Sequence, residues 1–278
     1  MIKEDIKIVQ EISFDVLKDI KEVCDNNNIE YFLLYGTLLG AIRHNGIIPW
    51  DDDIDIGMTR ENYLKFVQVA PKQLNKRDEI FIMGSGSTKY VSELKIGRRG
   101  TKYCVADGKN LGIMNQISVD IFLVDYLRNH PIKLRPILNK VRKFLLLTKL
   151  NWDEKKYLIG RINASNRRIK FPYKLGLYLL HGIRSLFTEK GLEYIIYKIY
   201  VGNNRTSKNF GVMTGDTRVR YWPTKFSLIT HDFEGLDLPI PDCYDVMLKE
   251  SYGDYLQWPP EDKRFRKDIE NWILRVNE

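Results

Sequence analysis

The sequence has few cysteines and no long apolar run, and both features limit the classes of protein to which it can belong. Its three cysteines, Cys24, Cys104 and Cys243, lie far apart and form neither a CxxC pair nor a disulfide framework. This spacing predicts a reducing compartment and no structural zinc. The uncharged run from Tyr31 to Ile42 is shorter than the ~20 residues that a membrane-spanning helix needs. The N-terminus also lacks the apolar core of a signal peptide, so we expect a cytoplasmic protein, soluble or peripheral on the inner face of the membrane.

Composition predicts a packed globular protein with one basic surface. Of the 278 residues, 44% are hydrophobic and 12% aromatic, enough for one large domain or a core with an insertion. Residues 128–170 contain 13 Lys or Arg against 2 acids, a local charge of +11, so the rest of the chain carries about −3 of the total +8. Such a segment suits a phosphate-rich partner or an anionic membrane, and a solvated helical face explains it equally well. No RNA-binding motif is present, so we expect no nucleic-acid partner.

The pattern of apolar residues predicts an α/β (α+β) protein. Residues 2–24 have the period of an amphipathic helix, a strand is expected at about 30–35, and a short helix from Thr37 to about Arg43. A second strand is expected at 54–58, followed by a helix from about Arg60 with Thr59 as its N-cap. Further strands are expected near 79–83, 89–96, 101–106 and 117–125, and helices near 134–150, 153–170, 174–187 and 190–201. The predicted layout is a catalytic core at 1–130, a basic helical insertion at 131–205, and a C-terminal segment at 206–278 that packs back on the core.

Alternating aspartates before and within the second strand are the strongest chemical signal. Asp51, Asp53 and Asp55 have the spacing that puts side chains on one face of an extended chain, while Ile54 and Ile56 point to the other face. Carboxylates this close repel one another unless a cation lies between them. Magnesium, or manganese in its place, suits this group because it binds carboxylate oxygens and substrate phosphates together. A solvent-exposed acidic turn is the alternative interpretation.

Two further features support a phosphate-transferring site. Gly36 and Thr37 lie between a predicted strand and a predicted helix. There, backbone N–H groups and the Thr37 hydroxyl can donate hydrogen bonds to an anion, and glycine allows a phosphate to approach the main chain closely. This strand–turn–helix–strand order is typical of nucleotidyltransferase-fold enzymes. Asp120 lies in the apolar run 117–123 and is the candidate third carboxylate, since an unpaired charge there is costly; a buried salt bridge is the alternative. Asp125 has the opposite parity, so a regular strand cannot turn both acids toward one metal.

The segment from Leu34 to Ile56 closely resembles the signature of the LicD family of phosphotransferases, the relatives of fukutin and the fukutin-related protein. Supporting similarities lie at 118–122, 252–255 and 259–264, whereas 131–205 carries no family motif. The resemblance implies a nucleotidyltransferase-like mixed β-sheet core. It also implies transfer of a phosphorylated alcohol from a cytidine diphosphate donor to a sugar hydroxyl, with release of CMP. Bacterial members typically transfer phosphocholine from CDP-choline to teichoic acid or lipopolysaccharide precursors, and other relatives transfer ribitol or glycerol phosphate.

The resemblance also implies roles for individual residues. Asp53 and Asp55 hold magnesium and Asp120 completes the site. Asp120 or Asp51 accepts the proton of the attacking hydroxyl, with a second metal at Asp51 as another reading. Residues expected to bind the donor are Gly36, Thr37, Arg43, His44, Lys95 and Arg98. Residues expected on the acceptor side, which faces a lipid-linked or oligosaccharide glycan, are Tyr252, Asp254 and Arg264.

For several of these residues a structural role is the alternative. His44 could be a core residue, Arg43 could pair with an aspartate, and the turn containing Arg98 could be an exposed basic loop. A choline site needs aromatic faces, but the sequence does not select them among 16 tyrosines and 5 tryptophans. The rival functions are an enzyme of the same fold with another substrate and a binding protein whose active site has decayed.

Overall fold

The structure is a computed structural model of the chain. It describes residues 2–81, 93–106, 116–128, 134, 137–138, 189–201, 209–212, 222–223, 225–261, 264 and 271–276. The helices of these ranges are α1 (Ile2–Asn26), α2 (Tyr35–His44), α3 (Arg60–Gln73), α7 (Glu189–Tyr200) and α8 (Tyr244–Tyr252). The strands are β1 (Phe32–Leu33), β2 (Ile54–Thr59), β3 (Asp78–Phe81), β4 (Glu93–Arg98), β5 (Thr101–Ala106), β6 (Ser118–Leu127), β7 (Asn209–Val212), β8 (Leu228–Phe233), β9 (Leu236–Pro241) and β10 (Asn271–Val276).

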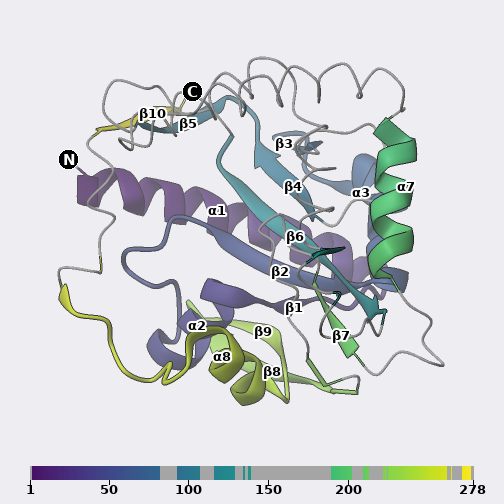
Figure 1. Cartoon of the computed structure of the whole chain (residues 1–278). Coiled ribbons are helices and arrows are strands. Elements are labelled where there is room, and N and C mark those ends of the chain that lie inside the picture. Colours follow the sequence, from purple (N-terminus) through teal and green to yellow (C-terminus); the bar gives the residue numbers. More distant parts are fainter. Residues whose placement is uncertain are drawn as a thin grey trace, which may run out of the picture.

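A mixed sheet forms the centre of the molecule (Figure 1). Its strand order is β1-β2-β6-β4-β3, and β7 also pairs with β6. The pair β2–β6 is parallel, whereas β1–β2, β4–β6, β3–β4 and β6–β7 are antiparallel. Two small ribbons, β5–β10 and β8–β9, flank the sheet. The mixed sheet with its helices confirms the predicted fold class.

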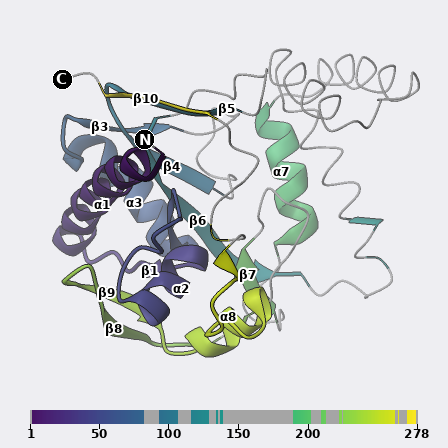
Figure 2. The same ribbon diagram turned by 90° about the vertical axis from the view of Figure 1, so that its left-hand side faces the viewer.

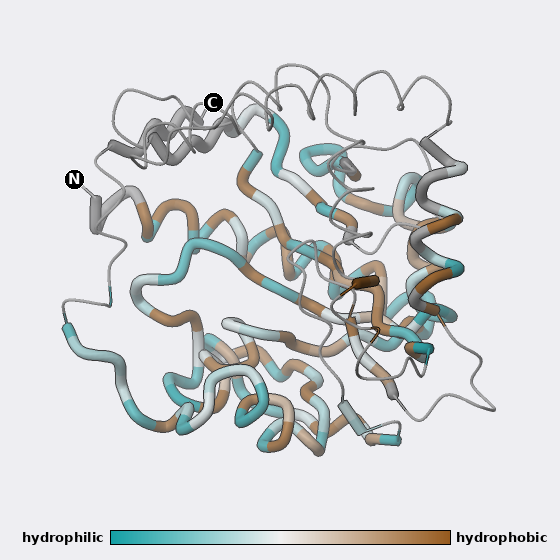
Figure 3. The backbone as a smooth tube through the Cα atoms, in the orientation of Figure 1, coloured by the Kyte–Doolittle hydropathy of each residue, from teal (hydrophilic) through white to brown (hydrophobic). Residues whose placement is uncertain are grey.

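The two faces of the sheet are chemically different because side chains alternate along each strand. One face packs against α1 and α3, which lie side by side (Figures 1 and 2). The aliphatic residues of this face, including Ile54, Ile56, Ile96 and Ile121, belong to the main core with the apolar stripe of α1. Hydrophobic residues accordingly recur along α1 and the central strands (Figure 3). The opposite face carries Asp55 and Asp120, so the carboxylates lie away from the main core.

The chain enters α2 differently from the sequence prediction. The strand expected at 30–35 is only Phe32–Leu33, and α2 begins at Tyr35, two residues before Thr37. The turn is made by Tyr35, whose φ of 46° is left-handed, and not by Gly36. A non-glycine residue in this conformation is strained, and such residues cluster at functional sites. The other predicted elements of the first 128 residues are confirmed to within a few residues, including α1 and the start of α3 at Arg60.

The C-terminal part of the chain contributes strands to the first part. β7 adds to β6, and β10 pairs with β5 over the full length of both strands. Of the predicted basic helices only α7 is among the described elements, and most of the predicted insertion, including nearly all of 131–170, lies outside the described residues. Within the described ranges, no helix has both the length and the apolar character required to span a bilayer.

Candidate active site

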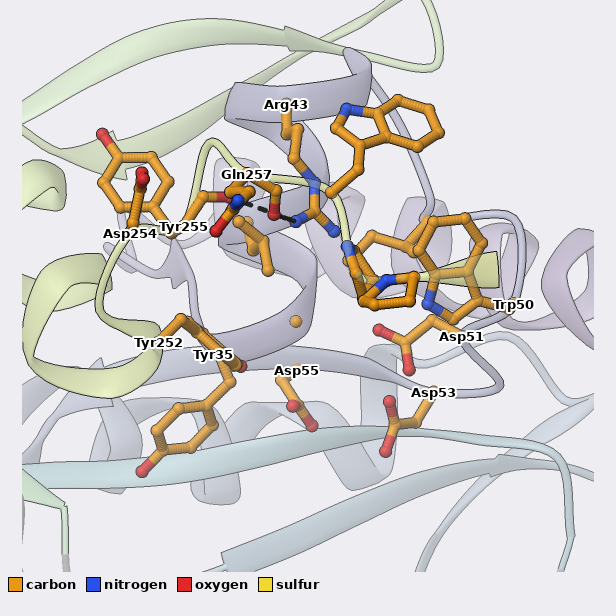
Figure 4. A pocket seen from close by; sticks show the side chains of 16 residues that line it. Tyr35, Arg43, Trp50, Asp51, Asp53, Asp55, Tyr252, Asp254, Tyr255 and Gln257 are labelled. Atoms are coloured by element: carbon orange, nitrogen blue, oxygen red, sulfur yellow. Dashed lines mark hydrogen bonds between the residues drawn. The ribbon is translucent and has the colours of Figure 1, made fainter. Parts of the chain in front are cut away.

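A pocket of about 700 Å³ opens at the start of β2, beneath the segment that follows α8. Its walls combine four carboxylates with five aromatic side chains, and Figure 4 shows the pocket from close by. The lining residues are Tyr35, Gly36, Leu39, Arg43, Ile48, Trp50, Asp51, Asp53, Asp55, Tyr252, Asp254, Tyr255, Gln257, Trp258, Pro259 and Pro260. A second cavity of about 1070 Å³ is larger, but Asp51, Asp53 and Asp55 do not line it. We therefore place the candidate active site in the smaller pocket.

The predicted aspartates converge on this pocket. Asp51 and Asp53 lie in the loop before β2, Asp55 lies within β2, and all three side chains turn toward the same space (Figure 4). Carboxylate oxygens of Asp51, Asp52 and Asp53 can all lie within 4.8 Å of one another. Asp55 is buried, with 9% of its surface exposed. The alternative of a solvent-exposed acidic turn describes Asp53, which is exposed, but not Asp51 and Asp55, which are partly and fully buried.

Burial and the neighbouring charges raise the pKa values of three of the pocket aspartates. Burial raises the pKa of Asp51 to about 8, and the charges of Asp53 and Asp52 add to the shift. Loss of solvent raises the pKa of Asp53 to about 6, with further contributions from the charges of Asp52 and Asp120. For Asp55, burial and then the charge of Asp53 raise the pKa well above its ordinary range. Burial and crowding thus disfavour the charged forms of these carboxylates, and a bound divalent ion relieves that condition.

These shifts predict how stability depends on pH. A carboxyl whose pKa is raised by folding binds more protons in the folded than in the unfolded state, so stability falls as pH rises from about pH 4 to about pH 8. We expect the melting temperature of metal-free protein to fall over this range. Magnesium should raise it, and by more at pH 8 than at pH 5, because fewer protons must then leave the ligands. Thermal melts with and without magnesium test this, and a larger magnesium effect at pH 5 would contradict it.

Gly36 and Thr37 serve the carboxylates directly. A Cβ at Gly36 would lie 2.5 Å from Asp51 Oδ2, so glycine is required for the close approach of this carboxylate to α2. The Thr37 hydroxyl accepts a hydrogen bond of 2.8 Å from the backbone N–H of Asp55 and is 4% exposed. Thr37 does not line the pocket, contrary to the expectation of a hydroxyl facing the donor. Its observed contact fixes α2 against β2 at Asp55.

Asp120 and Lys95 lie beside Asp55 on the neighbouring strands. Asp120 is opposite Asp55 in the β2–β6 register, and Lys95 is opposite Asp120 in the β4–β6 register. The Lys95 ammonium forms an ion pair with the Asp120 carboxylate. The sequence placed Asp120 correctly beside the aspartate strand. It did not indicate that the donor-binding candidate Lys95 pairs with Asp120.

Arg98 does not belong to the site. It lies three residues after Lys95 on β4 and therefore on the opposite face of the sheet. There its Nε donates to Asp78 Oδ1 at 2.6 Å, and its guanidinium lies 3.4 Å from Asp19 of α1. The structure therefore does not bring Arg98 to the pocket, where donor binding was expected of it, and pairs it with the buried carboxylate of Asp78.

Arg43 and His44 connect α2 to the segment that covers the pocket. Arg43 lines the pocket, and its Nη1 donates to the carbonyl oxygens of Tyr255 and Gln257 at 3.1 and 3.4 Å. His44 packs between Trp50 and Trp258, with ring centroids 5.8 and 4.8 Å away. Burial, and secondarily the charge of Arg43, lowers the pKa of His44, so its ring is neutral at neutral pH. His44 does not line the pocket, which favours the structural interpretation over donor binding.

The acceptor-side candidates divide into two groups. Tyr252 and Asp254 line the pocket. Arg264 instead lies over Trp50 and Trp258, with its guanidinium 5.6 and 5.1 Å from the two ring centroids, and its Nε donates to the carbonyl of Pro259 at 2.9 Å. Arg264 therefore fastens the C-terminal segment to the loop that precedes the aspartates.

Most of the aromatic wall was not predicted from the sequence. Tyr35, Tyr255 and Trp258 line the pocket and were not among the predicted site residues. Trp258 is 48% exposed. In the sequence, a tryptophan beside two prolines within the family-like segment 252–264 is a signal that could have drawn attention to it. Nothing local indicates that this segment meets α2, some 210 residues earlier in the chain.

The residues present suit a hard divalent cation. All the candidate ligands are carboxylates, their pKa values are raised by burial and then by mutual repulsion, and they line a pocket open to substrate. The cysteines Cys24 and Cys243 do not line the pocket.

The segment that holds the aspartates matches a known protein family. Residues 28–130 match the family described as LicD/FKTN/FKRP, nucleotidyltransferase domain. This part of the chain is thus similar to a LicD-family domain. This domain contains Gly36, the aspartates and Lys95, whereas the pocket wall at 252–260 lies beyond it.

Three relatives of this chain are informative. The lipopolysaccharide cholinephosphotransferase LicD of Haemophilus influenzae is 28% identical over 257 residues, which cover 91% of this chain and 92% of that protein. An uncharacterised protein of Rickettsia typhi is 45% identical over 75 residues, 25% of this chain and 24% of its own. The human ribitol 5-phosphate transferase FKRP is 48% identical over 40 residues, 14% of this chain and 8% of its own. The similarity to the first of these extends over nearly the full length of both chains.

Proposed function

We propose that this protein transfers phosphocholine from CDP-choline to a sugar hydroxyl of a cell-surface glycan precursor, of the teichoic acid or lipopolysaccharide type, and releases CMP. The chain is a phosphotransferase, and its named relatives transfer phosphate-linked groups. The identity of the donor, the need for magnesium and the nature of the glycan are the new parts of the proposal. The observation that carries it is the union of clustered carboxylates and aromatic side chains in one pocket.

The carboxylates supply the phosphoryl-transfer part of the pocket. The acceptor hydroxyl attacks the phosphorus of phosphocholine, the bond to CMP breaks, and the proton of the hydroxyl passes to Asp120 or Asp51. Asp53 and Asp55 would hold magnesium, with Asp120 beside them. When bound, the metal neutralises charge that develops on the phosphoryl group. Gly36 has no Cβ, so the Asp51 carboxylate can lie close to α2 at the edge of this metal site.

The aromatic side chains support a choline donor over a polyol. A quaternary ammonium makes no conventional hydrogen bond and is bound by aromatic faces and carboxylates. Trp50 and Trp258 already contact the guanidinium of Arg264. We therefore assign the choline group to the part of the pocket that Tyr35 and Tyr252 line (Figure 4).

A donor panel tests this assignment. We expect the protein with magnesium and a glycan acceptor to release CMP from CDP-choline with a kcat/KM at least about tenfold above that for CDP-ribitol or CDP-glycerol, since a pocket built for one group leaves the other poorly bound. The control is a reaction without acceptor, which corrects for donor hydrolysis. If a polyol donor turns over and CDP-choline does not, the phosphocholine assignment is wrong, and the alternative of polyol phosphate transfer takes its place.

Association with an anionic membrane remains part of the proposal. The basic segment 128–170 carries a net charge of +11, and lipid-linked acceptors are presented at a membrane surface. Around 137–148 the sequence has the apolar and basic sides of an interfacial helix. Flotation with anionic vesicles at moderate salt decides between this and a helix packed on the core, because a packed helix leaves the protein in the soluble fraction.

A further inference from the structure

The loop that carries Asp51 and Asp53 is held in place by residues that are distant from it in the sequence. It begins at Asn45, the C-cap of α2, and leads into β2. At its start, a carboxylate oxygen of Glu234, in the turn between β8 and β9, accepts a hydrogen bond of 2.8 Å from the backbone N–H of Ile47. The backbone N–H of Glu234 donates to the carbonyl of Asn45 at 3.0 Å. None of these three residues lines the pocket, so the start of the loop is anchored outside it.

The end of the same loop is held by one glutamine of α1. The side-chain nitrogen of Gln10 donates to the carbonyl oxygen of Ile48 at 3.1 Å and to that of Asp51 at 2.8 Å. A carboxamide nitrogen has two hydrogens, so one half-buried side chain serves both carbonyls. The Ile48 carbonyl also accepts the backbone N–H of Asp51 at 2.9 Å. Gln10 therefore binds both ends of the turn that leads into the aspartates.

This contact determines how the aspartates leave the chain. The carbonyl of Asp51 belongs to the planar peptide that joins Asp51 to Asp52, so binding it restricts the backbone dihedrals on both sides of that peptide. On α2, Gly36 leaves room for the Asp51 carboxylate. α1 packs against β4 and β6, so the amide is presented by a fixed helix. Gln10 does not line the pocket and acts on the site only through the backbone of the loop.

We propose that Gln10 is a positioning residue for the metal and the donor diphosphate, because it fixes the loop from which Asp51 and Asp53 reach the pocket. Groups that orient the ligands of a metal without binding it are worth about 10–100-fold in metal affinity or activity. The inference rests on the proposed metal-dependent function. It adds a residue that precedes 28–130, the part of the chain that matches the family.

Manganese titration of the full chain tests the inference without an activity assay. Free Mn²⁺ is measured by electron paramagnetic resonance, and a thermal melt of the metal-free protein is recorded alongside. Gln10→Met keeps the length of the side chain but donates no hydrogen bond. We expect this variant to fold, because Glu234 still anchors the start of the loop, and its dissociation constant for Mn²⁺ to rise about tenfold.

Gln73 of α3 provides a matched control. Its side-chain nitrogen also donates to a neighbouring element, to Asn27 Oδ1 at 3.2 Å, and it does not line the pocket. Gln73→Met therefore loses a hydrogen bond of the same kind at a distance from the aspartates. Its melting temperature can fall as that of Gln10→Met does, but its dissociation constant for Mn²⁺ should equal that of the wild type.

The possible results separate the inference from the proposed function. A wild-type dissociation constant for folded Gln10→Met, or an equal loss of affinity in Gln73→Met, would overturn the role of Gln10 while leaving a metal-dependent transferase in place. A wild type that binds no manganese contradicts both. If Gln10→Met does not fold, as judged by circular dichroism, Gln10→Asn is measured instead. Its amide is one methylene shorter and cannot reach both carbonyls, so the same tenfold weakening is expected.

Discussion

Replacing Asp53 with asparagine is expected to lower kcat by about 10³-fold, which corresponds to about 4 kcal/mol of transition-state stabilisation. Asparagine keeps the shape of the side chain but removes the charge that would bind the metal. The fold should survive, because Asp53 lies among like charges that raise its pKa, and removing one of them relieves repulsion. We therefore expect the melting temperature of metal-free Asp53→Asn to equal or exceed that of the wild type.

The measurement is CMP release with saturating magnesium, alongside a thermal melt. Asp237→Asn is the matched control, since Asp237 is an exposed aspartate of β9 that does not line the pocket, and its activity should equal that of the wild type. Near-normal turnover by folded Asp53→Asn would show that this carboxylate is not a ligand of a catalytic metal.

Substitution by alanine should have different effects at two glycines of α2: it should lower turnover at Gly36 and stability at Gly40. At Gly36 the added Cβ meets a carboxylate oxygen of Asp51 at 2.5 Å, whereas at Gly40 it meets the backbone oxygen of Gly46 at 2.4 Å. A side-chain end can move, so Gly36→Ala should stay folded, displace Asp51, and lose about 10²-fold in kcat, the loss typical of a misplaced catalytic group. Backbone cannot move as easily, so Gly40→Ala should lose about 1–3 kcal/mol of stability.

Urea unfolding and CMP release on both variants make the comparison. The fraction of Gly40→Ala that folds should have nearly wild-type kcat, because Gly40 does not line the pocket. If Gly36→Ala keeps full activity, the position of Asp51 does not matter for turnover and its proposed role as a base is lost.

The centre of the site could be predicted because its chemistry is local. The alternation of Asp51, Asp53 and Asp55 with isoleucines fixes which side chains share a face, and the strand β6 supplies Asp120 from an apolar run of its own. The same alternation of side chains applies to β4, where it was not used in the prediction. Lys95 and Arg98 were both expected to bind the donor, yet three residues along a strand put them on opposite faces, one beside Asp120 and the other beside Asp78.

The part of the pocket wall formed by residues 252–260 could not be predicted, because its contacts with the rest of the pocket are long-range. Arg43 looked like a phosphate ligand from its place beside the signature, and its hydrogen bonds to Tyr255 and Gln257 arise only when the C-terminal segment folds over α2. The cluster of His44, Trp50 and Trp258 depends on the same fold-back. No periodicity or local motif records which distant segment will cover a pocket.

Anomalous diffraction from crystals of the full chain grown with Mn²⁺ and CDP tests the central claim most directly. The claim is that a divalent ion and the donor's diphosphate meet at the aspartates that line the smaller pocket. We expect one manganese peak bonded to Asp53 and Asp55, with the phosphates of CDP beside it and below the aromatic wall. Manganese or CDP bound instead in the larger cavity near Arg60 and Asp125, or CDP in the aspartate pocket without a metal, would contradict it.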